Sequence, residues 1–172
     1  LYIPAVHGNN PQINIRKYFV RKLNSVKSPV KQIIPHFGIV HDKVQIEVSR
    51  GCMRGCRFCY PAFVNRPYRE RTTNKIINES KCILENSGYD ELNYISLSIS
   101  DYSSIDNLLI KTNNNFISNG VSISTPSLRV DTFSRELTKI ISGVKKSGLT
   151  FAVESGMQQG RNAINKNINT ND

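Results

Sequence analysis

No apolar run in the 172-residue sequence approaches the roughly 18 residues that a membrane-spanning helix needs. A charged segment followed by an apolar one, which is typical of export signals, is also missing from its beginning. Acidic residues are scarce, with 13 Asp and Glu against 23 Lys and Arg, so the net charge is +10. We therefore expect a cytoplasmic protein without membrane contact. The charge permits a polyanionic partner such as RNA, but the favoured interpretation is a solvated basic surface or a charge balanced by other parts of a longer chain.

Cysteine is the other scarce residue type that carries information. Only four are present, and without an export signal they indicate a reducing compartment, where cysteine serves metal binding or catalysis rather than disulfides. Three of them, Cys52, Cys56 and Cys59, lie in one loop with a C-x3-C-x2-C spacing. Glycine and arginine residues separate them, a composition that is poor for a hydrophobic core. We therefore predict a metal site in this loop.

Two kinds of metal site fit three clustered thiolates. Structural zinc takes four protein ligands, so it would need Cys82, His36 or His41 in addition. Cys82 falls on an expected helix beside apolar residues, where a buried packing role is the favoured interpretation. The alternative is a 4Fe-4S cluster with three protein ligands and one iron left open, since the bacterial ferredoxin spacing differs from this one. Gly51 and Gly55 would let the backbone wrap closely around such a cluster.

The rest of the pattern predicts an α/β protein. From Lys43 onward, alternating apolar residues predict strands, and apolar residues at helical spacing predict helices. The expected strands span residues 44–48, 92–99, 121–124 and 149–153, and the expected helices span residues 73–87, 105–118 and 133–147. Such units imply right-handed crossovers and a parallel sheet, either barrel-like or doubly wound. Residues 1–43 contain four prolines and predict an extended connector, with a short strand at Gln32–Ile34.

Polar side chains follow each of the four expected strands. Cys52–Cys59 follows the first, Ser100 and Asp101 the second, Thr125–Arg129 the third, and Glu154 with Ser155 the fourth. In a parallel sheet the carboxyl ends of all strands meet at one edge, where barrels and open α/β sheets build their sites. We therefore expect one site at this edge.

These residues resemble those of a known superfamily. The C-x3-C-x2-C motif, with Phe58 before its last cysteine and a strand before the motif, is similar to that of the radical S-adenosylmethionine (radical-SAM) superfamily. Further segments resemble an uncharacterised bacterial subgroup with an upstream cobalamin-binding-type domain: residues 46–52, 66–71, 96–103, 126–131 and 164–167. The resemblance implies a parallel partial (β/α) barrel truncated to about four βα units, because the usual core has about six. Residues 1–43 would be the connector from a missing upstream domain, and residues 44–172 the N-terminal part of the barrel. We therefore expect this chain to be a piece of a longer polypeptide and to be inactive alone.

The resemblance also implies a mechanism. Cys52, Cys56 and Cys59 would bind three irons of a 4Fe-4S cluster, and S-adenosylmethionine would chelate the fourth. Reduction by a donor such as flavodoxin or ferredoxin would then give methionine and a 5′-deoxyadenosyl radical that abstracts a substrate hydrogen. Methyl or methylthio transfer is the reaction class to test first, with RNA as one expected substrate. Cobalamin, bound by a domain outside this chain, is a further expected cofactor.

The resemblance assigns cofactor-binding roles to several residues. Asp101 would accept the methionyl amine, Glu154 the ribose hydroxyls, and Arg129 would pair with the methionyl carboxylate. The full expected set is Phe58, Ser100, Asp101, Arg129, Glu154 and Ser155. The chain departs from the subgroup at Tyr60–Phe63, at Val153–Met157 and at Gly160. These departures concern the substrate side of the pocket.

A basic, aromatic segment surrounds the last cysteine and leaves two interpretations open. It contains Arg54, Arg57, Arg66, Arg69 and Arg71 beside Tyr60, Phe63 and Tyr68. The favoured interpretation is that these side chains hold the cofactor or seal the barrel mouth; the other is that they bind a nucleic-acid backbone and stack bases. The latter belongs to an alternative hypothesis, in which the chain is a non-catalytic cysteine-rich metal-binding module that contacts nucleic acid through a basic face.

Overall fold

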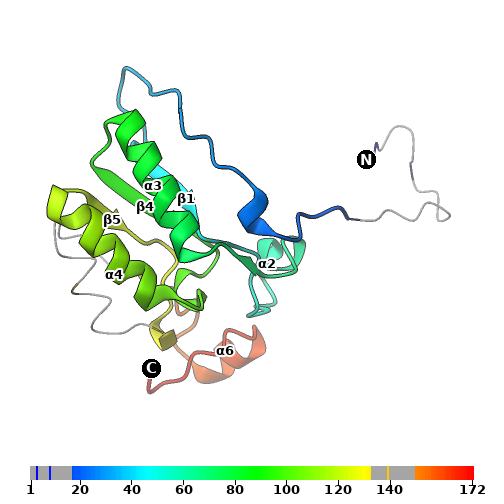
Figure 1. Ribbon diagram of the computed structural model, residues 1–172. Helices are drawn as coiled ribbons and strands as arrows, with labels where there is room; N and C mark the ends of the chain where they lie inside the picture. The colour runs from blue at the N-terminus through cyan, green and yellow to red at the C-terminus, as the bar shows by residue number, and fades with distance from the viewer. Residues whose placement is uncertain (1–2, 4–7, 9–16, 133–138, 140–149) are drawn as a thin grey trace.

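The main sheet has three parallel strands with both long helices on one face. The computed structural model describes residues 3, 8, 17–132, 139 and 150–172 (Figure 1). The strand order is β1-β4-β5, with bounds Val44–Glu47, Glu91–Ile95 and Ser122–Ser124. Helices α3 (Thr73–Ser87) and α4 (Ile105–Phe116) lie side by side over this sheet (Figure 1). Strands added in chain order with their helices on one face form part of a barrel, whereas a doubly wound sheet carries helices on both faces.

The core lies between this sheet and the two helices. The alternation predicted for the first strand is confirmed, since Val44 and Ile46 are buried while Gln45 and Glu47 are half-buried. Ile76 and Ile83 of α3 pack in the same cluster, and each such side chain contributes about 1.5–3 kcal/mol by leaving water. Tyr94 of β4 is fully buried, and its hydroxyl is 2.7 Å from the Thr112 hydroxyl on α4. In the described ranges, none of the helices combines the length and apolar character needed to cross a membrane.

The second strand ends four residues earlier than predicted. The sequence predicts a strand as far as Ile99, but β4 ends at Ile95, and Ile99 begins the short 3-10 helix η2 (Ile99–Asp101). Ser96 explains the difference, because its hydroxyl accepts a hydrogen bond from the Ser98 backbone N–H at 3.2 Å. Serine side chains that bond nearby backbone in this way compete with strand pairing. At the end of α4, the 3-10 helix η3 (Ile117–Asn119) continues the turn to Gly120, where the sequence predicts the stop.

The last predicted strand–helix unit is only partly within the described residues. Its helix, expected over residues 133–147, lies outside them except for Lys139, and Val130–Thr132 forms the 3-10 helix η4. Of the fourth strand, Leu149 lies outside the described residues, and residues 150–153 form no strand. Phe151 packs against the core, but Val153 is 42% exposed, so the alternate burial that specifies a strand is missing there. Helix α6 (Gln158–Ala163) follows.

The cysteine loop has local structure that the sequence did not predict. Strand β2 (Ser49–Arg50) pairs antiparallel with β3 (Arg69–Glu70), and the short helix α2 (Tyr60–Val64) lies between them along the chain. Two-residue strands are too short to give a recognisable alternation. Their pairing nevertheless brings both ends of the cysteine loop together beside the carboxyl end of β1.

The described part of the connector, residues 17–43, is irregular apart from the 3-10 helix η1 (Leu23–Ser25). The short strand predicted at Gln32–Ile34 is wrong, because Ile33 is fully exposed and has no strand to pair with. Leu23 is buried, and the Asn24 side chain accepts a hydrogen bond from the Thr72 backbone N–H at 2.9 Å. The connector therefore packs on the domain. Whether a domain boundary falls near residue 43 stays a prediction.

A buried ion pair joins the connector, α3 and the segment after β3. Glu79 Oε2 lies 2.5 Å from Arg71 Nη1 and accepts a hydrogen bond from the Ser28 hydroxyl at 2.5 Å. Lys75 Nζ lies 2.7 Å from the other carboxylate oxygen. Because Arg71 is only 3% exposed, its charge depends for compensation chiefly on Glu79, with the Glu47 carboxylate more distant at 3.8 Å.

We predict that Glu79→Gln lowers the free energy of unfolding by about 3 kcal/mol, since it leaves the Arg71 charge buried and incompletely compensated. Urea unfolding followed by circular dichroism measures this. Glu85→Gln on the same helix is the matched control, because Glu85 pairs with Lys81 at 3.9 Å in solvent and should change stability by less than about 0.5 kcal/mol. Equal losses in the two variants would contradict the argument.

Candidate metal centre

The three predicted cysteine ligands lie between β2 and α2. Cys52 and Cys56 are buried, Cys59 is half-buried, and none forms a disulfide. The backbone N–H of Arg54 points at Cys52 Sγ with an N–S distance of 3.4 Å. Backbone N–H groups directed at sulfur are typical of loops that surround metal-binding cysteines.

Gly51 and Gly55 adopt the left-handed backbone region that favours glycine, with φ of 92° and 78°. At Gly51 the space is also closed, because a Cβ there would lie 2.8 Å from the Asn65 carbonyl oxygen and 2.9 Å from that of Pro67. The chain after α2 therefore passes directly against the start of the cysteine loop. Only glycine permits this approach.

The cysteines border a cavity of about 190 Å³ at the carboxyl edge of the sheet. Its other walls come from the loop after β4, the loop after β5 and the C-terminal segment. Of the residues expected in the site, Phe58 and Arg129 line it with the three cysteines. The remaining lining residues are Arg54, Gly55, Ala62, Leu97, Ser98, Ser127, Leu128, Ala152 and Lys166.

The segment after α6 closes this cavity from the C-terminal side. The Asn165 side-chain amide donates to the Gly55 carbonyl oxygen at 2.9 Å, and the Arg57 backbone N–H donates to the Ile164 carbonyl oxygen at 2.9 Å. Arg129 Nη2 donates to the Lys166 carbonyl oxygen at 3.0 Å. These bonds link residues that are more than thirty positions apart in the sequence and hold the segment against the cysteine loop.

Lys166 connects two of the expected site residues. Its ammonium lies 5.6 Å from the centre of the Phe58 ring, in a cation–π contact, and 3.1 Å from Glu154 Oε1. Glu154 itself does not line the cavity but reaches it through this lysine. Ser155 lies further out, where its hydroxyl accepts the Met157 N–H at 3.3 Å before α6.

Four non-glycine residues in the described part of the chain have positive φ, and all belong to the surroundings of this cavity. They are Ser127, Glu154, Asn165 and Asn167. Such conformations cost about 1–3 kcal/mol each and concentrate at functional sites, where the surrounding structure enforces them. Their clustering here supports a functional role for the cavity.

Asp101 pairs with a residue that the sequence did not assign to it. Arg54 holds the carboxylate with two hydrogen bonds, one of them from Nε to Oδ2 at 2.8 Å. Burial is the largest single influence and acts to raise the pKa of Asp101. Hydrogen bonds from Arg54 and Ser98, together with the positive charges of Arg54 and Arg129, outweigh it, so the pKa lies below its usual value. Arg54 also lies 3.3 Å from Asp131, which links the cysteine loop to the loops after β4 and β5.

Ser100 and Arg129 are buried and hydrogen-bonded within the protein. The Ser100 hydroxyl accepts a hydrogen bond from the Thr132 hydroxyl at 2.7 Å, and Arg129 pairs with Asp131 through two bonds of 2.9 Å. Their present contacts therefore position the two loops. Neither contact tests the cofactor-binding roles expected for them.

Sequence reasoning missed Asn165 and Lys166 as site residues. It placed Arg54 in the segment expected to hold the cofactor or seal the barrel mouth but missed its pairing with Asp101. Asn165 and Lys166 lie in a segment that the sequence marked for another reason, residues 164–167. The usable signal was two asparagines flanking one lysine, since asparagine tolerates the left-handed conformation seen at Asn165 and Asn167. Such a turn displays the lysine between them.

The residues considered as extra zinc ligands lie elsewhere. Cys82 is exposed on α3, so the expectation that it is a buried packing residue is wrong, because the buried positions of that helix include Ile83 and Ser80 on another face. His36 and His41 are exposed in the connector. In the described part of the chain, no three His, Cys, Asp or Glu side chains are spaced to hold a single metal ion. A cluster does not require this, since each thiolate binds a different iron.

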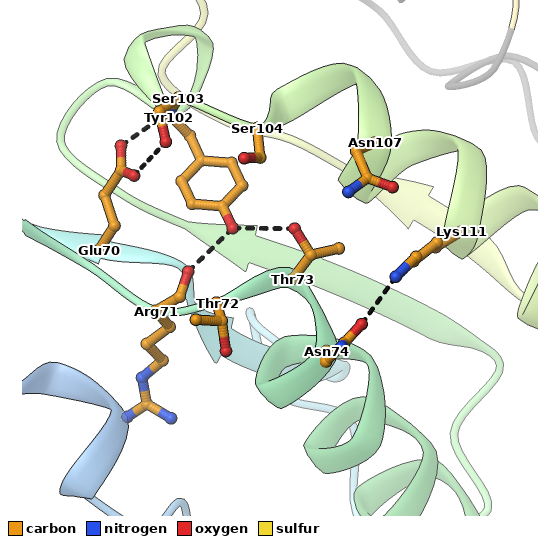
Figure 2. A pocket seen from close by; sticks show the side chains of 10 residues that line it. All are labelled: Glu70, Arg71, Thr72, Thr73, Asn74, Tyr102, Ser103, Ser104, Asn107 and Lys111. Atoms are coloured by element: carbon orange, nitrogen blue, oxygen red, sulfur yellow. Dashed lines mark hydrogen bonds between the residues drawn. The ribbon is translucent and has the colours of Figure 1, made fainter.

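A second, larger pocket of about 360 Å³ lies at the N-terminal ends of α3 and α4 (Figure 2). Two of its charged side chains already have partners: Glu70 accepts from the Ser103 N–H at 2.8 Å and also from its hydroxyl, and Lys111 donates to Asn74 at 2.7 Å. No cysteine lines it. The cysteine cavity is therefore the better candidate despite its smaller volume.

We predict that Gly51→Ala destabilises the protein more than Gly88→Ala, by about 2 kcal/mol or more. Both glycines have positive φ, so both variants carry the left-handed strain of about 1–2 kcal/mol. Only at Gly51 does the added Cβ also collide with backbone, because nothing lies within 4 Å of the corresponding position at Gly88. Urea unfolding measures the difference, and similar losses would show that the loop can move away.

We predict that the stability difference between the protein and its Asp101→Asn variant depends on pH. Because the folded pKa of Asp101 is lowered, its charged form stabilises the fold above the unfolded value of about 4, and this contribution disappears as the pH falls through the folded pKa. Urea unfolding should show the variant as the less stable protein at neutral pH, with the gap shrinking below about pH 4. A gap independent of pH would contradict this assignment.

Comparison with known proteins gives the family. The family model described as "Radical SAM superfamily" matches residues 46–172, which contain the whole cysteine loop and its cavity. The chain is also 30% identical over 159 residues to "Uncharacterized protein MJ0966" of Methanocaldococcus jannaschii. That match covers 92% of this chain and 34% of the relative, so the chain spans about a third of the relative's length. On the family match, this chain belongs to the radical SAM superfamily.

Proposed function

We propose that this chain is the cluster-binding part of a radical-SAM enzyme, in which Cys52, Cys56 and Cys59 hold a 4Fe-4S cluster. The observation that carries the proposal is the placement of these three thiols on one loop. They border a cavity that is also lined by the loops after β4 and β5 and by the C-terminal segment. Three protein ligands leave one iron of such a cluster open to a small molecule.

The donor set fits this group chemically. Thiolates are the ligands that iron–sulfur clusters take, and an N–H directed at Cys52 Sγ is the kind of contact that tunes them. When bound, the cluster would coordinate S-adenosylmethionine and supply the electron that cleaves it into methionine and a 5′-deoxyadenosyl radical. The protein's own part is to orient the bound molecule and to exclude water from it.

The cavity walls offer groups for the cosubstrate. Phe58 presents an apolar ring, and Lys166 a cation that would attract a carboxylate. Glu154 remains our proposed ribose-binding residue and Asp101 our proposed amine-binding residue. Each of these carboxylates is paired with a cation in the structure. Binding would therefore require Glu154 to release Lys166, and Asp101 to accept the methionyl amine while it still pairs with Arg54. Arg129, Ser100 and Ser155 are proposed to support these residues.

Methyl or methylthio transfer is the reaction class that we propose to test first. The use of cobalamin, of an electron donor such as flavodoxin, and of domains outside this chain remain predictions. They concern the whole protein, since the match to the relative covers only 34% of that relative's length.

The proposal predicts iron binding that depends on three cysteines and not on the fourth. After anaerobic reconstitution with iron and sulfide, we expect a brown protein whose iron content falls by more than half in Cys52→Ser, Cys56→Ser and Cys59→Ser. Cys82→Ser is the matched control and should keep its iron, because Cys82 is exposed on α3. The EPR signal of the reduced protein should change on addition of S-adenosylmethionine.

Two outcomes would overturn the proposal. One is a colourless protein that binds a single zinc and loses it in Cys82→Ser, which would identify the zinc-binding module instead. The other is a reconstituted cluster whose EPR signal is unchanged by S-adenosylmethionine, which would indicate a cluster without an accessible iron.

A further inference from the structure

The net charge of this protein is concentrated in two segments. Residues 17–41 contain five basic and no acidic residues, and residues 48–69 also contain five basic and no acidic residues. The rest of the chain carries 13 basic and 13 acidic residues and is therefore neutral. The whole formal charge of +10 is thus confined to the connector and the cysteine loop. A general compositional bias would have spread it along the chain.

The fold places the start of the first segment against the second. Lys17 Nζ donates to the Arg66 carbonyl oxygen at 2.8 Å and also bonds the Val64 carbonyl oxygen. Arg69 donates to the Val20 carbonyl oxygen at 2.8 Å, and its guanidinium lies 5.6 Å from the centre of the Phe19 ring. The connector around η1 consequently lies beside α2 (Figure 1). Two regions of like charge are held together, although they repel each other.

Aromatic rings are exposed in the same two segments. Tyr18 is 93% exposed and Tyr60 76% exposed, and Phe58 and Phe63 are about half exposed. The Arg66 guanidinium lies 4.8 Å from the centre of the Phe63 ring, which forms a flat, cationic stack open to solvent. We call this set the basic–aromatic surface; it comprises Tyr18, Phe19, Arg21, Lys22, Phe58, Tyr60, Phe63 and Arg66.

Three arginines in or beside the cysteine loop are not counted in this surface, because their side chains already bond to groups within the protein. Arg54 pairs with Asp101, and Arg71 is buried against Glu79. Arg69 donates its hydrogen bonds to backbone carbonyl oxygens. For these three the interpretation that they seal the cysteine loop is the better one. Arg21, Lys22 and Arg66 have no acidic partner among the described residues.

We propose that the basic–aromatic surface binds single-stranded RNA. Cations that follow one face attract a phosphate backbone, and exposed rings provide faces on which unpaired bases stack. Duplexes hide those base faces, whereas RNA presents them in loops and single-stranded regions. An acidic protein would be attracted by the cations but would leave the rings without a partner. The observed combination therefore favours a single strand.

The surface reaches the cysteine cavity through Phe58, whose ring is 54% exposed and also lines the cavity. A strand bound there would lie at the cavity mouth. The inference itself stands apart from the proposed cluster, because no cysteine contributes to the surface. Binding can therefore succeed or fail independently of iron content.

The test is fluorescence anisotropy of the full 172-residue chain with a labelled single-stranded RNA of about 12 nucleotides, with the duplex of the same sequence as comparison. We expect tighter binding of the single strand, weakening as salt rises. Arg21→Glu should reduce the slope of log affinity against log salt by about 0.7 for each lost phosphate contact. Lys81→Glu is the matched control on the neutral part of the chain, where its side chain is 66% exposed.

The rings are tested separately. Tyr18→Ala and Tyr60→Ala should each weaken binding about fivefold or more, since stacking is lost while the charge is unchanged. Ile110→Ala, at a side chain 53% exposed on α4, should leave binding unchanged. Circular dichroism confirms that each variant is folded.

Three results would overturn the inference. Equal affinity for single strand and duplex, or equal competition by polyglutamate of the same charge, would show that the surface recognises charge alone. Unchanged affinity in both tyrosine variants would show that the rings take no part. Absence of RNA binding together with binding of an acidic redox protein such as flavodoxin would assign the surface to that class of partner.

Discussion

The close approach of Gly51 to the backbone of residues 65–68 is the constraint on which the site depends. A side chain at this position would meet two carbonyl oxygens within 3 Å, so the loop can return past its own start only because glycine lacks a Cβ. The return brings β3 beside β2, and these strands hold the ends of the segment that contains Cys52, Cys56 and Cys59. The buried Arg71–Glu79 pair then joins that return to α3 and the connector. One tight backbone contact thus relates the thiols to the sheet, the helices and the preceding chain.

The cavity is completed by long-range contacts rather than by the cysteine loop alone. Asn165 bonds Gly55, and Arg54 bonds Asp101 and Asp131, so three loops and the C-terminal segment fix one another. The charges inside are already paired, with Glu154 on Lys166 and Asp101 on Arg54. Pairing lets ionised groups remain in a partly buried site without a large desolvation penalty. It also means that a ligand with an amine or a carboxylate has to compete with, or share, an existing partner.

Sequence patterns predicted the regular elements well where burial is one-sided. The alternation in β1 and the helical spacing of Ile76, Ile83 and Leu108 identify core-facing positions, and those residues are buried. Predictions failed where local hydrogen bonds or short elements decide the backbone. Ser96 ends β4 early through its own side chain, and β2 and β3 are too short to show any period. The exposure of Cys82 was missed because a helix places adjacent residues on different faces, so apolar neighbours in sequence do not imply a buried position.

The sequence alone determined the superfamily resemblance, the identity of the three thiols and the concentration of charge, because each depends on residue type and spacing along the chain. Tertiary structure alone decided which charged groups are available. It pairs Arg54, Arg71 and Asp101 within the protein, and it leaves the side chains of Tyr18 and Tyr60 exposed to solvent. It also brought Lys166 to the cavity from over a hundred residues beyond the cysteines, next to the ring of Phe58. Spacing cannot show such pairings, because hydrogen bonds and ion pairs depend on distances that only the folded chain fixes.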